Sequence, residues 1–373
     1  MKIMLIGTAY PYRGGLAVYN ERLMRQFQNE GHEVEIMTFT LQYPSFLFPG
    51  KTQYSEEPMP SDLKITRCVN SINPFNWLKI GRRLRKSRPD LIIIKFWLPF
   101  MAPCFGTIAR LARKNRHTKV ISVLDNIIPH EKRLGDRAFA RYFVNSVDGF
   151  VAMSQSVYDD LSLFDTKKPR CLCPHPLFDS FGESIERPAA IKHLKLDENC
   201  RYMLFFGLVR AYKGLDLLID AFADARLRKF NVKLIVAGEF YDDPKPYLEQ
   251  IEKYNLKDLV IIENQFINDT DVKYYFNAAD IIVQPYKSAT QSGVTQIAYH
   301  FEKPMLVTNV GGLGEIIPNG KVGYVVEPNQ VSIADALVDF YENEKYNTFV
   351  EGVKEEKKKY QWSNMTEAIM NLL

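Results

Sequence analysis

The sequence has few of the features that mark secreted, disulfide-stabilised or membrane-spanning proteins. Its 373 residues include only five cysteines, and the pair Cys171 and Cys173 has neither metal-site nor thioredoxin spacing. The most apolar stretch, residues 91–109, is interrupted by a lysine and two prolines, so it does not predict a spanning helix. The first seven residues hold too short an apolar run for a signal peptide. We therefore expect reduced thiols and a cytoplasmic location.

The charge is unevenly distributed. Residues 1–180 hold 26 Lys and Arg against 16 Asp and Glu, a net charge of +10, whereas residues 181–373 carry a net charge of −6. A basic first half and an acidic second half indicate two units with different partners.

Short apolar runs alternate with helical patterns throughout the chain. In the first half, runs such as Ile3–Ile6 and Val34–Phe39 flank a helical spacing between Leu16 and Asn29. A second series runs from Tyr202–Phe206 to Met305–Thr308. Such alternation predicts two parallel-stranded, Rossmann-like sheets, with ligands at the carboxyl ends of their strands.

The predicted domains follow from this pattern. Residues 169–196 are rich in proline, lack periodicity and are expected to form the linker. The first domain is then 1–180, with a terminal helix at about 355–373 packing back on it, and the second is 181–354.

The segment from Phe205 to Asp216 is the strongest single motif. A strand ends at Gly207, a short loop presents Arg210 and Lys213, and a helix begins near Asp216. Two fixed cations at such a place would neutralise the charge that grows on a departing diphosphate. Taken alone, a loop with two solvated cations explains the same residues as well.

Two further loops precede helices. After the strand ending at Gln284, the helix expected to start at Ser292 and Gly293 offers free backbone N–H groups to a phosphate; the alternative is an ordinary serine cap. After the first strand, Gly14 and Gly15 allow close backbone approach to a ligand, or simply form a tight turn.

In order and spacing these motifs resemble the retaining nucleotide-sugar glycosyltransferases of family 4, which have the GT-B fold of two Rossmann-like domains facing across a cleft. The resemblance covers nearly the whole chain. It includes Gly14-Gly15, Gly31-His32, Ser154, Gly311-Gly312 with Glu315, and the closing segment Tyr360–Ser363. It implies an acceptor-binding first domain, in which Asp125 and His130 stand in the catalytic element, and a donor-binding second domain.

The sequence departs from the family at two places. The family's Glu-x7-Glu pair is replaced by Ala289 and Ile297, so Thr290 or Gln291 is expected to contact the donor sugar and Gln296 the ribose. The first-domain motif begins with Asp125 instead of histidine, leaving His130 as the nearest imidazole. The expected donor site comprises Gly14, Gly15, Gly207, Thr290, Gln291, Ser292, Gly293, Val294 and Gln296, with Arg210, Lys213, His130 and Asp125 as catalytic residues.

The resemblance also implies the reaction. The departing phosphate, held by Arg210, Lys213 and the N–H groups of residues 292–294, would accept the proton of the acceptor hydroxyl. No Asp-x-Asp motif stands at a strand end, so we expect no metal and no cofactor besides the nucleotide-sugar substrate. The expected acceptor is a glycan or a lipid-linked sugar. An inactive sugar-nucleotide-binding subunit and a nucleotide-sugar epimerase are the alternatives.

The segment Lys79–Arg88 holds most of the local positive charge. It indicates either attraction to the inner membrane face or to a lipid-diphosphate acceptor, or a solvated helix face. Nucleic acid is disfavoured, because no recognition motif accompanies the charge.

Overall fold

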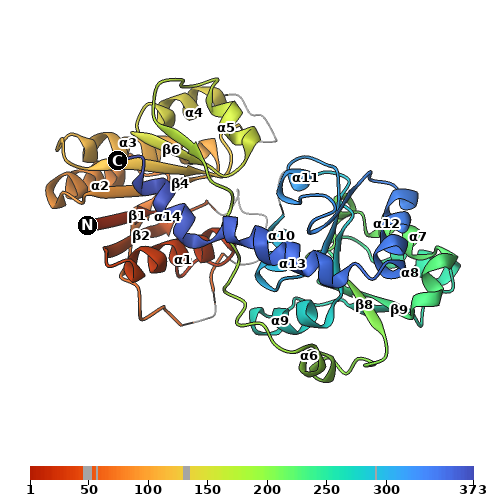
Figure 1. The fold of residues 1–373 in the computed structure, drawn as a ribbon. Coiled ribbons are helices and arrows are strands. Elements are labelled where there is room, and N and C mark those ends of the chain that lie inside the picture. Colours follow the sequence, from red (N-terminus) through yellow and green to blue (C-terminus); the bar gives the residue numbers. More distant parts are fainter. Residues whose placement is uncertain (45–52, 56–57, 129–134, 290–291) are drawn as a thin grey trace. The chain divides into compact units, whose positions relative to one another are not determined.

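The computed structural model describes residues 1–44, 53–55, 58–128, 135–289 and 292–373. These form two compact units, one of residues 1–175 and 361–373 and one of residues 176–360 (Figure 1). Each unit is a parallel sheet covered by helices on both faces. The expectation of two Rossmann-like units in tandem is confirmed.

The first unit has a seven-stranded parallel sheet with the order β3-β2-β1-β4-β5-β6-β7. Its central strands are runs of isoleucine, leucine and valine that are buried on both sides, as parallel strands between helices require. Its strands are β1 (Lys2–Ile6), β2 (Glu33–Leu41), β3 (Ile65–Asn70), β4 (Leu91–Phe96), β5 (Lys119–Leu124), β6 (Gly149–Ala152) and β7 (Arg170–Leu172).

Helices cover the two faces of this sheet with separate apolar clusters. One cluster packs under α2 to α5, and the other under α1 and α14. The helices are α1 (Gly15–Asn29), α2 (Pro74–Ser87), α3 (Ala102–Arg113), α4 (Asp136–Val144), α5 (Gln155–Leu161) and α14 (Trp362–Met370).

The second unit has a six-stranded parallel sheet with the order β10-β9-β8-β11-β12-β13. Its strands are β8 (Arg201–Phe206), β9 (Val232–Ala237), β10 (Val260–Glu263), β11 (Ile281–Gln284), β12 (Met305–Thr308) and β13 (Gly323–Val326). Helices α7, α8 and α12 pack on one face, and α6, α9 and α10 on the other. The helices are α6 (Arg187–His193), α7 (Leu215–Phe222), α8 (Lys245–Lys253), α9 (Asp269–Ala278), α10 (Gly293–His300), α11 (Leu313–Ile316), α12 (Gln330–Glu342) and α13 (Tyr346–Glu356).

The boundaries between the units differ from those predicted. The chain leaves the first unit at His175 rather than at 180, and returns to it at Gln361 rather than at about 355. The later return has a clear cause: α13 packs on the second unit, where a Cβ on Gly352 would lie 2.0 Å from the carbonyl oxygen of Lys321. Of α13 and α14, it is α14 that packs against α1, with the ring centroids of Trp362 and Tyr19 5.1 Å apart.

The expected linker is also more regular than predicted. It contains β7, a three-residue edge strand that pairs with β6, and the seven-residue helix α6. Elements this short carry too few residues for a periodic pattern to show. The strands β3 and β13 were missed as well.

Both sheets contain a point at which the strand order reverses. In the first unit β1 lies between β2 and β4, and in the second unit β8 lies between β9 and β11. The loops that leave two neighbouring strands at such a point diverge to opposite faces, which opens a crevice at the carboxyl edge. The fold therefore favours a site after β8 and β11, and a second after β1 and β4.

Candidate active site

Close backbone contacts hold together the two loops that follow β8 and β11. Gly214 adopts φ 70°, and a Cβ there would lie 2.0 Å from the carbonyl oxygen of Pro285. At the end of β8, Gly207 adopts φ 93° and donates its N–H to the carbonyl oxygen of Ala237. Only glycine fits the first position without displacing backbone. These contacts fix the loop from Gly207 to Gly214 against the loop that leads into α10.

Lys213 is the central cation of this edge. A Cβ built on Gly207 would lie 3.2 Å from Lys213 Nζ and 3.9 Å from Val294 Cγ2, which places the ammonium group between the end of β8 and the start of α10. Burial, and then the adjacent charge of Arg210, lower the pKa of Lys213 to about 8. Among the described residues no carboxylate lies within 4.0 Å of it.

Arg210 supplies a second positive charge to the same loop. Its guanidinium lies over the ring of Tyr241, 4.0 Å from the ring centroid, and its Nε is buried without a hydrogen-bond partner in the described part of the chain. Stacking on an aromatic face orients a guanidinium while leaving its N–H groups directed elsewhere. Arg210 and Lys213 therefore place two positive charges on one loop.

A neighbouring ion pair includes neither of these two cations. Lys287, in the loop after β11, pairs with Asp216 in the first turn of α7 at 2.6 Å. Asp216 is therefore already neutralised by a neighbour other than Lys213. Two cations that are close, partly buried and without a carboxylate form an arrangement that a bound anion would stabilise.

The N-terminus of α10 lies beside this pair. Ser292 occupies the cap position but makes no side-chain hydrogen bond to the helix; its hydroxyl lies 3.3 Å from the hydroxyl of Tyr286. The alternative interpretation of Ser292, an ordinary serine cap whose hydroxyl accepts a hydrogen bond from the helix, is therefore not observed. The backbone N–H groups of Gly293 and Val294 keep the partial positive charge of a helix start, which attracts anions.

Gln296, the residue predicted to contact the ribose, is buried in α10. Its side chain is 2% exposed, and neither its amide nitrogen nor its amide oxygen has a partner among the described residues. On the same helix, Thr295 exchanges hydrogen bonds of 3.2 Å with Gln284 of β11. A contact between Gln296 and a ligand would require this side chain to turn outward. Thr290, Gln291 and His130 lie outside the described residues.

The first unit carries a separate charged group at its own strand reversal. Asp125 follows β5, and its Oδ1 lies 2.9 Å from Nζ of Lys95, which is 2% exposed near the end of β4. The ammonium group also lies over the ring of Tyr19 from α1, 3.2 Å from the centroid. Burial lowers the pKa of Lys95, and the charge of Asp125 partly restores it.

Lys95 was missed as a functional residue, because in the sequence it only interrupts an apolar run. Its place in strand alternation is the signal that could have found it: it follows Leu91 and Ile93 onto the face covered by α1. Asp125 keeps 21% of its side chain exposed, so a ligand can reach it. The predicted glycines Gly14 and Gly15 start α1, and a Cβ on either would meet nothing within 4 Å.

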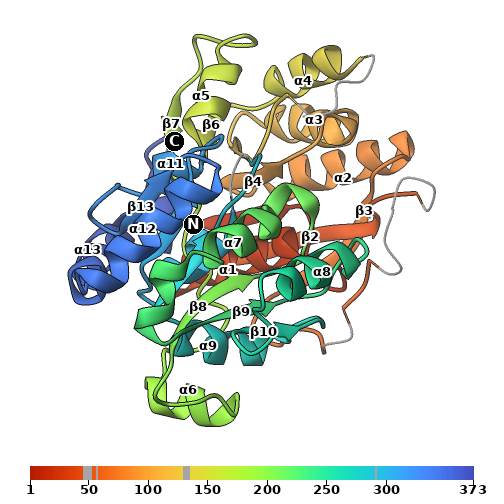
Figure 2. The ribbon, with the colours of Figure 1, turned by 90° about the vertical axis from the view of Figure 1, so that its right-hand side faces the viewer.

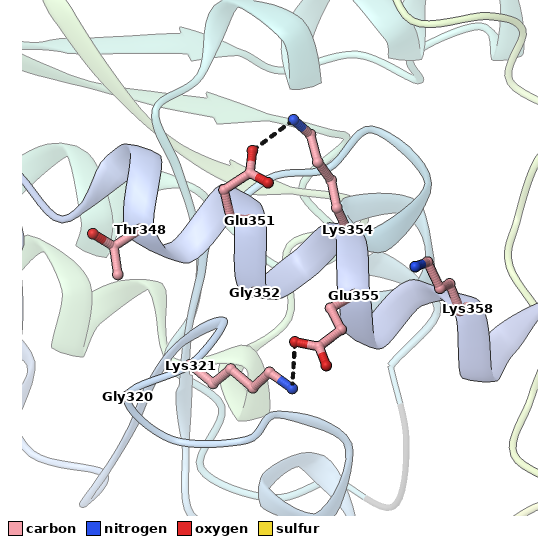
Figure 3. A pocket seen from close by; sticks show the side chains of 8 residues that line it. All are labelled: Gly320, Lys321, Thr348, Glu351, Gly352, Lys354, Glu355 and Lys358. Atoms are coloured by element: carbon pink, nitrogen blue, oxygen red, sulfur yellow. Dashed lines mark hydrogen bonds and ion pairs between the residues drawn. The ribbon is translucent and has the colours of Figure 1, made fainter.

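A surface depression of about 550 Å³ lies elsewhere on the second unit, between α13 and the loop before β13 (Figure 3). Its charges are matched internally: Lys321 pairs with Glu355 at 3.0 Å, and Lys354 with Glu351 at 2.8 Å. None of the predicted site residues lines it. Within the part of the chain that the structure describes, no three His, Cys, Asp or Glu side chains gather as metal ligands would.

Known protein families match both halves of the chain. Residues 13–171 match the family described as Glycosyltransferase Family 4, and residues 186–356 match the family described as Glycosyl transferases group 1. An uncharacterised glycosyltransferase of Methanocaldococcus jannaschii is 25% identical over 366 residues, covering 97% of this chain and 95% of that protein. The O-antigen chain mannosyltransferase C of Escherichia coli is 25% identical over 346 residues, 91% of this chain and 88% of its own length.

Solved structures share the fold. Sucrose-phosphate synthase from Thermosynechococcus elongatus has a TM-score of 0.72 at 15% identity, covering 100% of this chain and 98% of its own. The Anabaena protein HepE, in complex with UDP and glucose, has a TM-score of 0.71 at 14% identity, covering 100% and 99%. With a family match in each unit, the chain belongs to the GT-B glycosyltransferases, family 4 in its first half, and is a transferase of glycosyl groups.

Proposed function

We propose that the protein transfers a sugar from a nucleoside diphosphate sugar to a hydroxyl acceptor, and that the second unit holds the donor. The observation that carries this proposal is the pair of Lys213 and Arg210, two adjacent cations without a carboxylate among the described residues. A diphosphate matches this charge. HepE, which shares the fold, has been solved with UDP and with UDP-glucose.

The same arrangement supports the chemistry. As the bond from sugar to phosphate breaks, negative charge grows on the leaving diphosphate, and preorganised cations and N–H groups stabilise that charge most in the transition state. Lys213, Arg210 and the start of α10 supply such groups without a metal. In the retaining reaction that we propose, the leaving phosphate accepts the proton of the acceptor hydroxyl, so no carboxylate nucleophile is required.

We propose that the acceptor binds to the first unit. Asp125, ion-paired to Lys95 and partly exposed, can accept a hydrogen bond from a hydroxyl group. We propose a glycan or a lipid-linked sugar as the acceptor and a role in cell-surface glycan or glycolipid synthesis. The relatives named as an O-antigen mannosyltransferase and an α-monoglucosyldiacylglycerol synthase support this choice.

A panel of UDP-, GDP-, ADP- and TDP-sugars tests the donor site. The wild-type protein should gain thermal stability with one nucleotide class, because a ligand that binds only the folded state stabilises it. Lys213→Ala should lose this gain, whereas Lys287→Ala, which removes a nearby lysine already paired with Asp216, should keep it. The assignment is contradicted if no nucleotide sugar stabilises the wild-type protein, or if the ligand stabilises Lys213→Ala and Lys287→Ala equally.

Product analysis tests the reaction. With the donor so identified and glycan or glycolipid acceptors, we expect release of the nucleoside diphosphate together with a new glycosidic bond. Retention predicts that the new bond keeps the anomeric configuration of the donor, which proton NMR of the product reports. Free sugar as the product would favour the epimerase, and binding without turnover would favour the inactive subunit.

A further inference from the structure

The first unit carries a concentration of positive charge that the transfer reaction does not use. Between residues 63 and 119 the chain has 14 Lys and Arg and one acidic residue, Asp90. This segment builds α2 and α3, which pack side by side in Figure 1 and Figure 2. Seven of these cations lie on this pair of neighbouring helices, five on α2 and two on α3.

One side of α2 is regularly cationic. Lys79, Arg82 and Lys86 follow Phe75 at intervals of four, seven and eleven residues, which places all four on one side of the helix, and all four are exposed. The C-terminal end of α2 adjoins that of α3, because the Asn115 side chain donates a hydrogen bond to the carbonyl oxygen of Arg85 at 3.4 Å. The cationic side of α2 thus continues onto the end of α3.

Most of these cations lack a carboxylate partner. We define the basic face as Lys79, Arg82, Arg85, Lys86, Lys114 and Arg116, six exposed residues for which no Asp or Glu oxygen lies within 4.0 Å among the described residues. Arg113 and His117 beside them do have partners, Asp148 at 2.6 Å and Asp90 at 2.8 Å. Six unmatched cations repel one another, and an extended anionic partner would relieve this repulsion.

Exposed apolar side chains lie at the N-terminal start of α2, at the other end of the helix from Arg85 and Lys86. Phe75, at the start of α2, is 83% exposed, and Ile72 just before the helix is 48% exposed. An aromatic ring at the tip of a cationic helix side is the combination found where proteins rest on a bilayer, with the ring among the acyl chains and the cations at the headgroups.

We propose that the basic face, together with Phe75, docks the first unit onto an anionic lipid bilayer. The contact is peripheral: no helix in the described ranges has the length and apolar character needed to span a membrane. Nucleic acid fits less well, because the cations spread over the outer sides of two helices and no base-reading motif accompanies them. The proposal stands on this surface alone and does not depend on the donor or acceptor proposed above.

Co-sedimentation of the full chain with vesicles tests the docking. The protein should pellet with vesicles of phosphatidylcholine and phosphatidylglycerol at low salt and remain in solution with pure phosphatidylcholine. Raising the salt to about 0.5 M should release it, because screening shortens the reach of the headgroup charge. Failure to pellet with the anionic vesicles, or equal pelleting with both kinds, overturns the proposal.

Variants locate the contact. Arg82→Gln/Arg85→Gln/Lys86→Gln should weaken vesicle binding by about a hundredfold, at roughly fivefold for each cation lost. Phe75→Ser should weaken it by about tenfold. The control Lys192→Gln/Lys195→Gln/Lys253→Gln removes three exposed lysines from the second unit and should bind as the wild type does.

Circular dichroism and thermal melting establish that each variant is folded. Equal loss of vesicle binding in the control and in Arg82→Gln/Arg85→Gln/Lys86→Gln would mean that only the net charge matters. That result would overturn the assignment to the basic face. A duplex DNA fragment that binds the same residues more tightly than the vesicles do would assign the face to nucleic acid and overturn it as well.

Discussion

Raising the pH through about 8 should weaken donor binding, because Lys213 then loses the charge that we propose holds the diphosphate. Its pKa is lowered to about 8 from 10.5, first by burial and then by Arg210. At 1.36 kcal/mol per unit, the empty site disfavours the charged lysine by about 3 kcal/mol. An anionic oxygen about 4 Å away returns about 4 kcal/mol at an effective dielectric of 20. Donor binding should therefore return the pKa of Lys213 to about its ordinary value.

The assay is the pH dependence of steady-state kinetics with the donor that the panel identifies. Above pH 8, kcat/KM for the donor should fall by about tenfold per pH unit, because it reports the free enzyme. The fall should level off after about two to three units, the usual cost of one lost contact to transition-state charge. At saturating donor, kcat should hold to a higher pH, because the bound lysine keeps its proton.

Two variants make the result specific. Lys213→Arg carries a charge that persists above pH 12, so its profile should stay flat across this range. Lys287→Gln should reproduce the wild-type profile, since Lys287 is exposed and paired with Asp216. A wild-type profile that is flat from pH 7 to 10, or an identical fall in Lys213→Arg, would refute the reasoning.

Four further outcomes are expected. Lys213→Met should unfold at a higher temperature than the wild type at pH 7 and lose this advantage between pH 8 and 10.5, because below pH 8 the folded wild type bears a disfavoured charge; an unchanged melting temperature would show that Lys213 is well solvated. Asp125→Ala should cost about 3–5 kcal/mol in urea unfolding at pH 7, since it leaves the buried charge of Lys95 unpaired, and Lys95→Met/Asp125→Asn should recover much of the loss. Transfer should survive EDTA, because side chains and helix N–H groups neutralise the diphosphate; loss that magnesium or manganese restores would falsify this. Gln296→Ala should raise the donor KM more than it lowers kcat, and Gln291→Ala should do the reverse; unchanged kinetics in both would exclude the loop before α10 as the donor site.

Apolar patterning predicted the fold well where strands are central. Met305–Thr308 was predicted with the bounds that the structure gives it, and Tyr202–Phe206 differs from β8 only at its first residue, because buried parallel strands are uninterrupted apolar runs. The edge strand β3, with Arg67 and Asn70 among its residues, lacks such a run and was missed. Edge strands are half-solvated, so their sequences need not be apolar.

For the candidate site, the sequence predicted positions but not environments. Arg210 and Lys213 were identified by their place after a strand, yet their burial depends on Gly214 meeting Pro285, a contact between segments about 70 residues apart. The same limit explains why the hydroxyl partner of Ser292 and the ion-pair partner of Lys95 were not predicted. Whether a hydroxyl caps its own helix or meets Tyr286, and whether a lysine faces solvent or Asp125, depends on neighbours that only the folded chain supplies.

The return of α14 to the first unit affects how the protein is made. Trp362, Met365 and Ile369 of this helix complete the apolar cluster beneath α1, so the first unit lacks part of its core until residues 362–369 have been synthesised. The second unit, residues 176–360, is continuous and can fold as soon as it leaves the ribosome. The amino-terminal unit is thus the last to be completed. A nascent chain stalled before residue 362 would therefore expose the apolar surface that α14 covers in the folded protein.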